Sequence, residues 1–427
     1  MKKEFKIGLL GCGSVGTEVV RLLSQKKKLL EARSGLQFTL KKIAVRDLKK
    51  KRPSFVDQKL LTTRPEDVVG DPEIDIVVEL MGGLETPEPL VLQAIRNGKS
   101  VVTGNKALLA ERGLVLFQEA REKRVPIGFE ASVAGGIPLL QAVSQGLIAN
   151  EIEASYGIIN GTSNYILSAM ADHNLSFETA LKEAQGRGFA EADPGLDIDG
   201  TDAAHKLSIL ATLCYGTAFP FRQVYIEGIR KITPFEIEMA KRFAYRIKLL
   251  AISRKSAGGI QLRVHPTMIP EIHPLASVSG GFNAITLIGD AVGETMFYGL
   301  GAGGRPTASA VVSDIVSVAR GMPLPVSFKK EVSIESIDDL RSEYYLRFTA
   351  VDKPGVLSRI AGILGANEIS IATVYQHEQD TGSKVPIVIM THECREKNLK
   401  KALVEIDKLD AVAEPTLLVH VDKLKGH

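Results

Sequence analysis

The chain has 427 residues, 44% of them hydrophobic and 24% charged, which suits two or three folded domains and excludes a wholly disordered or fibrous protein. Lys and Arg total 53 against 50 acidic residues, and the resulting charge of +3 gives no support for nucleic-acid binding. The 3 cysteines form no CxxC pair, which argues against a disulfide framework and favours a reducing compartment such as the cytoplasm. No apolar run of about 18 residues occurs, so we expect no membrane-spanning helix.

The first third of the chain alternates short apolar runs with helical patterns. Strands are predicted at 6–10, 38–45, 74–80, 100–103 and 125–129, and helices at 17–23, 87–97 and 111–123. This alternation is typical of a parallel sheet with crossover helices. We therefore predict an α/β protein that begins with a Rossmann-type dinucleotide-binding domain at 1–130, completed by about 301–325.

The middle of the chain, 131–300, is predicted to be an α+β domain for substrate binding and dimerisation. Helices are expected at 176–185, 201–215 and 234–252, and a further apolar helix at 307–319 follows this domain. His265 and His273 each precede a proline in what we interpret as a turn-rich segment, and no HExxH-like spacing supports a transition metal.

A polar linker is predicted at 326–342, and the remaining residues, 343–427, form a further domain. The expected order is strand, helix, strand, strand, helix, strand, at 344–351, 356–364, 369–376, 385–391, 396–409 and 416–421. That βαββαβ order predicts a ferredoxin-like fold.

A Gly-x-Gly-x-x-Gly sequence occupies residues 11–16, directly after an apolar strand and before a helix. In such a turn the first glycine permits the tight bend, the second lets the backbone approach a pyrophosphate, and the third lets helix and strand pack. The context favours dinucleotide binding over a turn that merely requires three glycines. The predicted contacts here are Gly11, Gly13, Ser14, Val15 and Gly16.

The residues that select the cofactor ribose are expected after the second strand, where Arg46 and Asp47 stand. Arg46 suits a 2′-phosphate and Asp47 a 2′-hydroxyl. A basic run at 49–52 lies nearby, although a solvated loop also explains it. We therefore favour NADP and leave NAD open.

Thr103 and Lys106 follow a strand at the carboxyl edge of the predicted sheet, where open α/β folds bind ligands. A lysine there can contact both cofactor and substrate, although it can also simply fringe the following helix. Another carboxylate, Glu130, stands beside a Gly-rich turn at 134–136, and carbonyl oxygens of such a turn can hold a monovalent cation. An ordinary tight turn explains that segment equally well.

The most informative stretch, 186–206, packs several acids into a Gly-bounded loop and then begins a helix. Asp202 and Lys206 are spaced i, i+4, so they share one helical face, whereas His205 points away and is interpreted as structural. An exposed ion pair or a loop-bound cation would explain the pattern. The alternative is a cleft in which carboxylates hold a cationic substrate and orient an ammonium as general acid.

Together these motifs resemble the homoserine dehydrogenase family, the NAD(P)-dependent enzymes of the aspartate pathway, over essentially the whole chain. The resemblance implies that Lys206 donates a proton to the aldehyde oxygen and that Asp197 is its carboxylate neighbour, while Glu191 and Asp202 hold the amino-acid substrate. It implies dinucleotide contacts at Gly13, Val15, Thr103, Lys106, Gly188 and Gly303, with Lys106 also at the junction of nicotinamide and substrate. It also implies a sodium site at Glu130, Val133, Gly135 and Ile137.

The C-terminal domain resembles an ACT domain, a resemblance carried by residues 351–357 and 367–371. ACT modules usually pair and bind amino acids at the pair interface, which implies feedback inhibition by L-threonine and a homodimer or homotetramer. The implied effector residues are Asp352, Gly355, Val356, Asn367 and Ile369.

The resemblance implies reversible reduction of L-aspartate 4-semialdehyde to L-homoserine in threonine, methionine and isoleucine biosynthesis, with the hydride coming from the nicotinamide. A lysine acting as base must lose its proton, so homoserine oxidation should accelerate as pH rises. A non-enzymatic sensor of nucleotide and amino acid is the alternative from another class, although a sensor needs no acid beside a nicotinamide. Another amino-acid dehydrogenase is the alternative within enzymes.

Overall fold

The computed structural model describes residues 3–322, 332–376 and 384–424, which form two compact units. The first unit comprises Met1–Glu153, Asp202–Val224 and Gly281–Glu331, and the second comprises Ala154–Thr201, Tyr225–Gly280 and Val332–His427. Part of the predicted linker and the end of the segment predicted at 301–325 lie outside the described residues.

The first unit contains a sheet of parallel strands in the order β3-β2-β1-β4-β5-β6. Its strands are β1 (Glu4–Leu10), β2 (Gln37–Ala44), β3 (Leu61–Thr62), β4 (Ile76–Glu79), β5 (Ser100–Thr103) and β6 (Ile127–Gly128). The unit also contains an antiparallel hairpin, β11 (Phe282–Gly289) and β12 (Gly293–Leu300). The predicted Rossmann-like sheet is thus confirmed.

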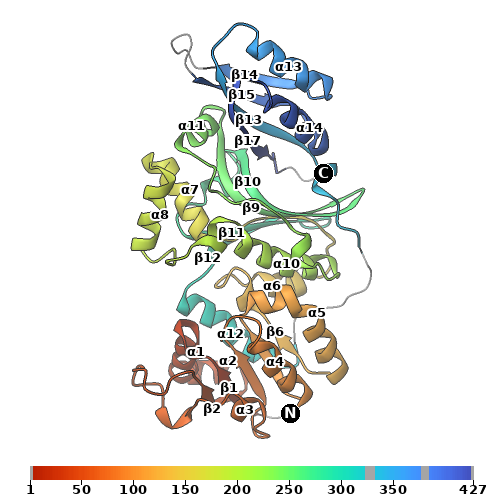
Figure 1. Cartoon of the computed structure of the whole chain (residues 1–427). Coiled ribbons are helices and arrows are strands. Elements are labelled where there is room, and N and C mark those ends of the chain that lie inside the picture. Colours follow the sequence, from red (N-terminus) through yellow and green to blue (C-terminus); the bar gives the residue numbers. More distant parts are fainter. Residues whose placement is uncertain (1–2, 323–331, 377–383, 425–427) are drawn as a thin grey trace. The chain divides into compact units, whose positions relative to one another are not determined.

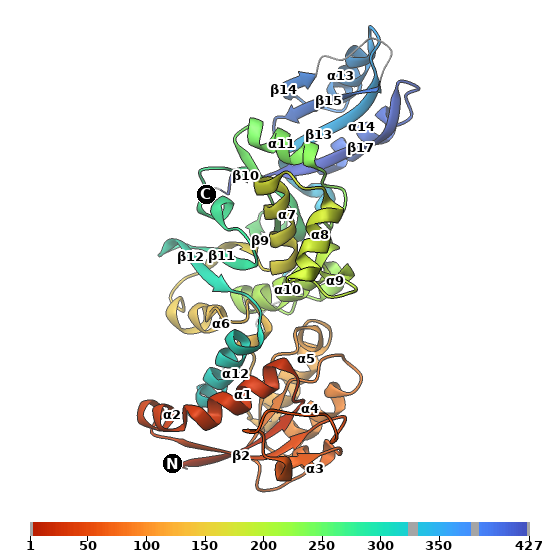
Figure 2. The same cartoon turned by 90° about the vertical axis from the view of Figure 1, so that its left-hand side faces the viewer.

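The first unit also contains helices. They are α1 (Ser14–Gln25), α2 (Lys27–Ser34), α3 (Glu66–Val69), α4 (Pro87–Arg96), α5 (Lys106–Lys123), α6 (Leu139–Gln141), α10 (Thr201–Tyr215) and α12 (Gly304–Ala319), with short η1 (Gln58–Leu60), η2 (Glu130–Ser132), η3 (Ala142–Gly146) and η4 (Phe221–Gln223). Figures 1 and 2 show α12 beside α1 despite their separation in sequence. Val19 of α1 and Val311 of α12 belong to one buried core with Ile7 and Ile76 of the strands, so burial of apolar side chains holds both helices in place.

In the second unit one sheet runs in the order β7-β9-β10-β17-β13-β15-β14, with β8 beside β10 and β16 beside β13. The strands are β7 (Ile152–Ile158), β8 (Tyr225–Ile226), β9 (Tyr245–Ser256), β10 (Gly259–Pro270), β13 (Arg341–Val351), β14 (Ile371–Gln376), β15 (Lys384–Thr391), β16 (Cys394–Arg395) and β17 (Val412–Val421). The helices are α7 (Gly161–His173), α8 (Phe177–Gly186), α9 (Gly195–Ile198), α11 (Pro234–Arg242), α13 (Val356–Ala366) and α14 (Glu396–Ile406), with η5 (Pro274–Ser277) and η6 (Ile337–Asp339). A short parallel pairing, Thr267 with His420 and Met268 with Val421, joins β10 to β17.

The C-terminal part of this unit has the predicted order of strand, helix, strand, strand, helix and strand. Its helices α13 and α14 cover one face of the sheet, where Tyr344 and Phe348 pack with Ile360 of α13 and Leu399 of α14. Alternate residues of β13 enter this core because successive strand side chains point to opposite faces. The ferredoxin-like prediction is confirmed.

Two predictions for the middle of the chain are wrong. The helix expected at 234–252 ends at Arg242, and Ala244 (φ 63°) turns the chain into β9, where the run from Ile247 to Ile252 is buried. This mostly apolar run, interrupted by Lys248, fits a buried strand as well as a helix, and pairing along β10 decides the outcome. His265 lies within β10 and not in a turn-rich segment.

Within the described residues, none of the helices has the length and apolar character needed to cross a membrane.

Candidate active site

The turn between β1 and α1 has the geometry of a phosphate-binding loop. A Cβ on Gly11, which has φ 97°, would lie 2.7 Å from the carbonyl oxygen of Leu80, and one on Gly16 would lie 2.3 Å from that of Gly11. A Cβ on Gly13 would meet nothing within 4 Å. The outer two glycines are therefore required by the fold, whereas Gly13 leaves space open beside the N-terminus of α1, where backbone N–H groups favour an anion.

The cavity beside this loop measures about 470 Å³, which is within the usual size range of small-molecule sites. It is lined by the glycine loop and by the ribose-selecting segment, including Gly11, Gly13, Arg46, Asp47, Lys50 and Arg52. The Arg52 guanidinium donates to the main-chain oxygen of Asp47 at 2.8 Å, which fixes the basic loop against the cavity. The residues present therefore fit a dinucleotide.

Three further predicted cofactor residues are placed by the fold. Gly303 is the N-cap of α12, and a Cβ on the next residue, Gly304, would lie 3.2 Å from the carbonyl oxygen of Ser14, so this helix start adjoins the glycine loop. Gly188, with φ 75°, belongs to the second unit. Val15 is partly buried against the core of the first unit.

Glu79, at the end of β4, is a residue that the sequence analysis missed. Its fully buried carboxylate accepts hydrogen bonds from Thr103 Oγ1 and from the main-chain N–H of Met81, both at 2.7 Å. Burial raises the pKa of this carboxyl above its usual value. Asn105 in turn donates to the Gly83 carbonyl at 2.8 Å and caps α5. Glu79 thus ties together the ends of β4 and β5 at the ligand-binding edge of the sheet.

Asp202 joins the two predicted lysines. Its Oδ1 lies 3.0 Å from Lys106 Nζ and its Oδ2 lies 2.7 Å from Lys206 Nζ. Asp202 and Lys206 are 6% and 8% exposed, so the interpretation of their i, i+4 spacing as an exposed ion pair is wrong. Two ammonium groups held side by side on one carboxylate are suited to stabilise an oxygen that gains negative charge.

His205 lies on another face of α10, as expected. Its ring centroid is 4.2 Å from that of Phe221, and its Nε2 is 3.9 Å from Glu111 Oε1. Burial lowers the pKa of the imidazole. These contacts agree with a structural role.

Asp197, in the second unit, is held by the beginning of α7. Asn160 Nδ2 donates to its Oδ1 at 2.7 Å, and Thr162 Oγ1 lies 3.1 Å from its Oδ2. Ser163 Oγ donates to its main-chain oxygen at 2.9 Å. The sequence analysis missed these three residues; the helix N-cap at Asn160 was the available signal.

The other acid assigned to substrate binding, Glu191, is exposed and lies between α8 and α9. Gln185 Nε2 donates to its main-chain oxygen at 3.1 Å, which leaves the carboxylate side free to face solvent. Its role stays a prediction.

Glu130 is a buried carboxylate at the segment predicted to hold sodium. Its two oxygens accept main-chain N–H groups of Leu140 at 2.9 Å and Gln141 at 2.7 Å, and its own N–H donates to Asp314 Oδ2 at 2.7 Å. Burial raises the pKa of Glu130 to about 7 and that of Asp314 well above its usual value. No cationic side chain pairs with Glu130 among the described residues.

The other members of the predicted sodium site lie in the turn that follows. Val133 and Ile137 have buried side chains, and Gly135 has φ 39°. A Cβ on Gly135 would lie 2.5 Å from the carbonyl oxygen of Gly301, so the turn packs tightly. Buried acids beside tightly packed carbonyls fit a small hard cation, and the described residues hold no cluster of three or more His, Cys, Asp or Glu side chains suited to other metals.

The predicted effector residues flank α13. Gly355 is its N-cap with φ 89°, and Val356 is its first, buried residue. Asn367 caps the other end, where its Nδ2 donates to the Ile363 carbonyl at 3.0 Å, and the N–H of Ile369 donates to the Leu364 carbonyl at 3.0 Å. Asp352 precedes the helix at the end of β13.

A Rossmann-like sheet with an open glycine loop, together with two lysines paired to one buried carboxylate, defines a nucleotide-dependent oxidoreductase. The chain matches family models for the homoserine dehydrogenase NAD-binding domain over residues 11–130, for homoserine dehydrogenase over 138–316 and for the ACT domain over 344–411. It belongs to the homoserine dehydrogenase family, whose substrates are aspartate semialdehyde and homoserine.

Relatives match along the full length. Homoserine dehydrogenase of Helicobacter pylori is 45% identical over 427 residues, covering 99% of this chain and 100% of that protein. The crystal structure of a homoserine dehydrogenase from Thiobacillus denitrificans superposes with a TM-score of 0.94 at 46% identity, covering 99% of each chain. A hyperthermophilic archaeal homoserine dehydrogenase in complex with NADPH matches 75% of this chain and 99% of its own at 25% identity and a TM-score of 0.63. The family assignment decides against the non-enzymatic sensor.

Proposed function

We propose that Lys206 is the proton donor in the reduction of L-aspartate 4-semialdehyde to L-homoserine. The observation that carries this role is the buried contact of Lys206 with Asp202, which keeps an ammonium in place away from bulk water. The bound dinucleotide supplies hydride chemistry. Lys206 and Lys106 stabilise negative charge on the substrate oxygen, and Lys206 delivers its proton there.

The same proposal gives Asp202, Glu191 and Asp197 distinct roles. Asp202 holds both ammonium groups, and together with Glu191 it binds the amino-acid part of the substrate. Asp197 orients the acid; its carboxylate is suited to this because Asn160 and Thr162 fix both of its oxygens. In the reverse direction Lys206 must first lose its proton, so homoserine oxidation accelerates as pH rises.

We further propose NADP as the preferred cofactor. Arg46, Lys50 and Arg52 line the cavity beside the glycine loop, and their positive charge suits a 2′-phosphate. Asp47 lines it too and suits a 2′-hydroxyl, so NAD stays the second candidate. Gly13, Ser14, Val15, Thr103, Gly188 and Gly303 are proposed as further dinucleotide contacts.

A sodium ion is the proposed resident cation. Glu130 and the main-chain carbonyls of Val133, Gly135 and Ile137 would hold it, and its charge would offset the burial of the Glu130 carboxylate. It would brace the turn that packs against Gly301.

L-threonine is the proposed effector, bound at the ACT domain by residues around α13 that include Asp352, Gly355 and Asn367. We propose a homodimer or homotetramer, a cytoplasmic location, and domains at 1–130 with 301–325, 131–300 and 343–427 joined by a linker at 326–342. Pairing of ACT modules supports the oligomer only by family resemblance.

One assay separates these proposals. The purified chain is given L-homoserine with NADP⁺ or NAD⁺, and formation of reduced nicotinamide is followed with Na⁺ or K⁺ and with or without L-threonine. We expect faster turnover with NADP⁺, dependence on Na⁺ and suppression by threonine. If a variant with both Arg46 and Lys50 replaced by Met turned over NADP⁺ as fast as the wild type, the cofactor assignment would be contradicted. If L-threonine left the wild-type rate unaltered, the effector assignment would be contradicted.

A further inference from the structure

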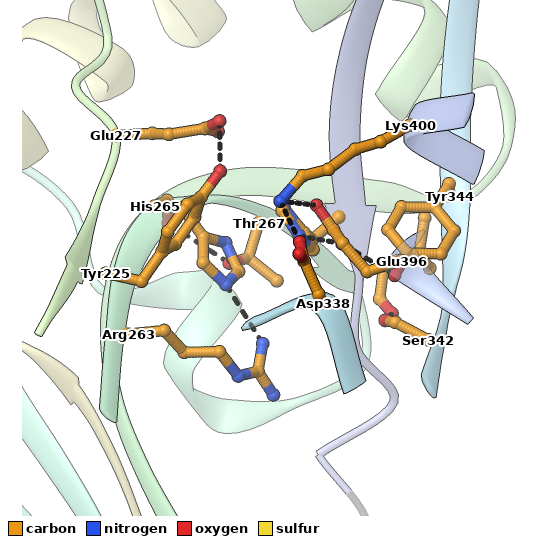
Figure 3. Close-up of polar contacts among 12 residues, drawn as sticks. Tyr225, Glu227, Arg263, His265, Thr267, Asp338, Ser342, Tyr344, Glu396 and Lys400 are labelled. Carbon is orange, nitrogen blue, oxygen red and sulfur yellow. Dashed lines mark hydrogen bonds and ion pairs between the residues drawn. The ribbon is translucent and has the colours of Figure 1, made fainter. Parts of the chain in front are cut away.

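Tyr225, in β8, contacts both the ACT domain and the strand next to it. Its ring centroid lies 6.3 Å from that of His265 in β10 and 6.4 Å from that of His420 in β17. Lys400 Nζ of α14 lies 5.6 Å from the same centroid, within the range of a cation–π contact. Figure 3 shows the Tyr225 hydroxyl donating to Glu227 on its other side.

The two histidines beneath Tyr225 form a buried stack. Their ring centroids are 3.9 Å apart with 28° between the planes, and both side chains are 0% exposed. Arg263 donates through NH1 to His265 Nε2 at 2.9 Å and through NH2 to Asp422 at 3.1 Å. A guanidinium can only donate, so His265 Nε2 accepts and the ring is neutral. The stack is therefore a fixed packing contact between β10 and β17.

Helix α14 is anchored to this stack through Glu396. His420 Nε2 lies 3.1 Å from Glu396 Oε2, which also accepts the Tyr344 hydroxyl at 2.7 Å. Lys400, one turn further along α14, lies 2.9 Å from Asp338 Oδ1 and 3.6 Å from Glu396 Oε1. These partners place the Lys400 ammonium over Tyr225, so a shift of α14 changes the contact with that ring.

The residues that follow Tyr225 in the chain contact the loop that carries Asp197. The N–H of Glu227 donates to the Val264 carbonyl at 2.7 Å, and that of Ile229 donates to the Ile198 carbonyl at 2.8 Å. A Cβ on Gly228 would lie 2.3 Å from the Ile198 oxygen and 2.6 Å from Asp199 Cα. The backbones are thus in direct contact, and movement of 227–229 displaces the loop.

The loop is also tied to this segment at its other end. Arg230 NH2 lies 2.9 Å from Asp199 Oδ2. Gly200 has φ 87°, and a Cβ there would lie 3.1 Å from Ile226 Cγ2. Residues 226–230 therefore hold residues 198–200 through a main-chain hydrogen bond, an ion pair and close packing. In the sequence, Asp197 immediately precedes segment 198–200, and α10, which carries Asp202 and Lys206, begins immediately after it.

We propose that Tyr225 is a positioning residue for the Asp197 loop and that α14 of the ACT domain acts on it through Lys400. The path runs from α14 to the Tyr225 ring, then through Glu227 and Gly228 to the loop. Two discrete positions of α14 would give the loop two positions, which is what a regulatory domain needs in order to alter substrate binding. The functional consequence rests on the role proposed above for Asp197.

The test replaces Lys400 with Met, which removes the charge and keeps the aliphatic stem. Lys401→Met is the matched control, since Lys401 is the next residue on the same helix and its side chain is exposed. We expect Lys400→Met to raise the KM for L-homoserine roughly three- to ten-fold. The KM for NADP⁺ should stay unchanged, and hydrogen exchange at the Ile229 amide should become faster. Lys401→Met should match the wild type in all three.

A double-mutant cycle shows whether Tyr225 lies on the path. Tyr225→Leu should raise the homoserine KM as well, and adding Lys400→Met to it should have no further effect, because the contact is already absent. Tyr225→Phe, which keeps the ring, should retain the response to Lys400→Met. If the two substitutions acted only by damaging the structure, their effects on the homoserine KM would add, and the KM for NADP⁺ would change as well.

Unchanged homoserine KM and Ile229 exchange in Lys400→Met, or additive effects in the double variant, would overturn the proposal. The Lys400 side chain is 41% exposed, so we expect Lys400→Met to fold. The proposal can therefore be tested with that variant even if Tyr225→Leu does not fold. Asp197→Asn is assayed alongside. Full activity in that variant would refute the role of Asp197. The exchange at the Ile229 amide in Lys400→Met would still show whether α14 acts on the loop through Tyr225.

Discussion

Asp202 Oδ2 lies 2.7 Å from Lys206 Nζ, one turn further along α10, in a site from which solvent is almost excluded. The other oxygen of the same carboxylate lies 3.0 Å from Lys106 Nζ. One acid therefore holds two cations, the buried Lys206 and the partly exposed Lys106, and the loss of its charge removes an ion pair from each.

Asp202→Asn should accordingly impair both catalysis and stability. An amide carries no charge and offers one acceptor oxygen, so both ion pairs are lost, and breaking a buried pair costs about 3 to 5 kcal/mol. We expect kcat/KM for homoserine to fall about 100-fold or more, with a lower melting temperature. Glu111→Gln, which alters the acid nearest His205, is the control and should keep nearly full activity. Wild-type kinetics in Asp202→Asn would remove this carboxylate from the site.

The glycine loop gives a prediction in which two similar substitutions differ. Gly13→Ala places its Cβ in open space, so the variant should melt like the wild type while its KM for NADP⁺ rises about ten-fold or more, because the methyl group obstructs the pyrophosphate. Gly16→Ala sets its Cβ 2.3 Å from the Gly11 oxygen, so it should lower the melting temperature as well. Thermal unfolding and cofactor titration measure both. Equal melting temperatures for the two variants would contradict the assigned geometry.

Lys248 gives a pH-dependent prediction for stability. It is 5% exposed, bonds to Asn164 Oδ1 at 3.2 Å and to the Val278 carbonyl, and burial lowers its pKa to about 8. The unfolded chain binds this proton more tightly, so the folded state gains stability as pH rises from about 8 to about 10.5 and loses it as pH falls over the same window.

Relative to Lys248→Met, the wild type should therefore gain roughly 2 kcal/mol in free energy of unfolding between about pH 7 and pH 9.5. Urea unfolding of both proteins at the two pH values measures the change. Lys255→Met, on the same strand and half-buried, serves as the control. A difference between wild type and Lys248→Met that does not vary with pH would show that Lys248 keeps its ordinary titration.

Local patterns predicted much of the fold. The Rossmann-like alternation, the glycine loop and the βαββαβ order all follow from periodicity and turn residues, which act over a few positions. The failure at 245–252 has a physical cause: a mostly apolar run with only two charged residues, Arg246 and Lys248, has no clear period, so its partner β10 distinguishes strand from helix.

The site was predictable only where its residues are close in sequence. The spacing of Asp202 and Lys206 places them together on α10. In contrast, Asn160 reaches Asp197 across 37 positions and Arg263 reaches Asp422 across 159. Such contacts depend on tertiary packing, and no local propensity encodes them. Glu79 was missed for a related reason, because a single acid at a strand end gives no sign that it is buried.

The most direct test of the account is homoserine-dependent formation of reduced nicotinamide by Lys206→Ala beside the wild type, with cofactor binding measured on both. We predict that kcat falls roughly 100-fold or more, the scale of general acid–base catalysis, while the affinity for NADP⁺ is retained. Normal turnover in Lys206→Ala would contradict the assignment of Lys206 as the proton donor.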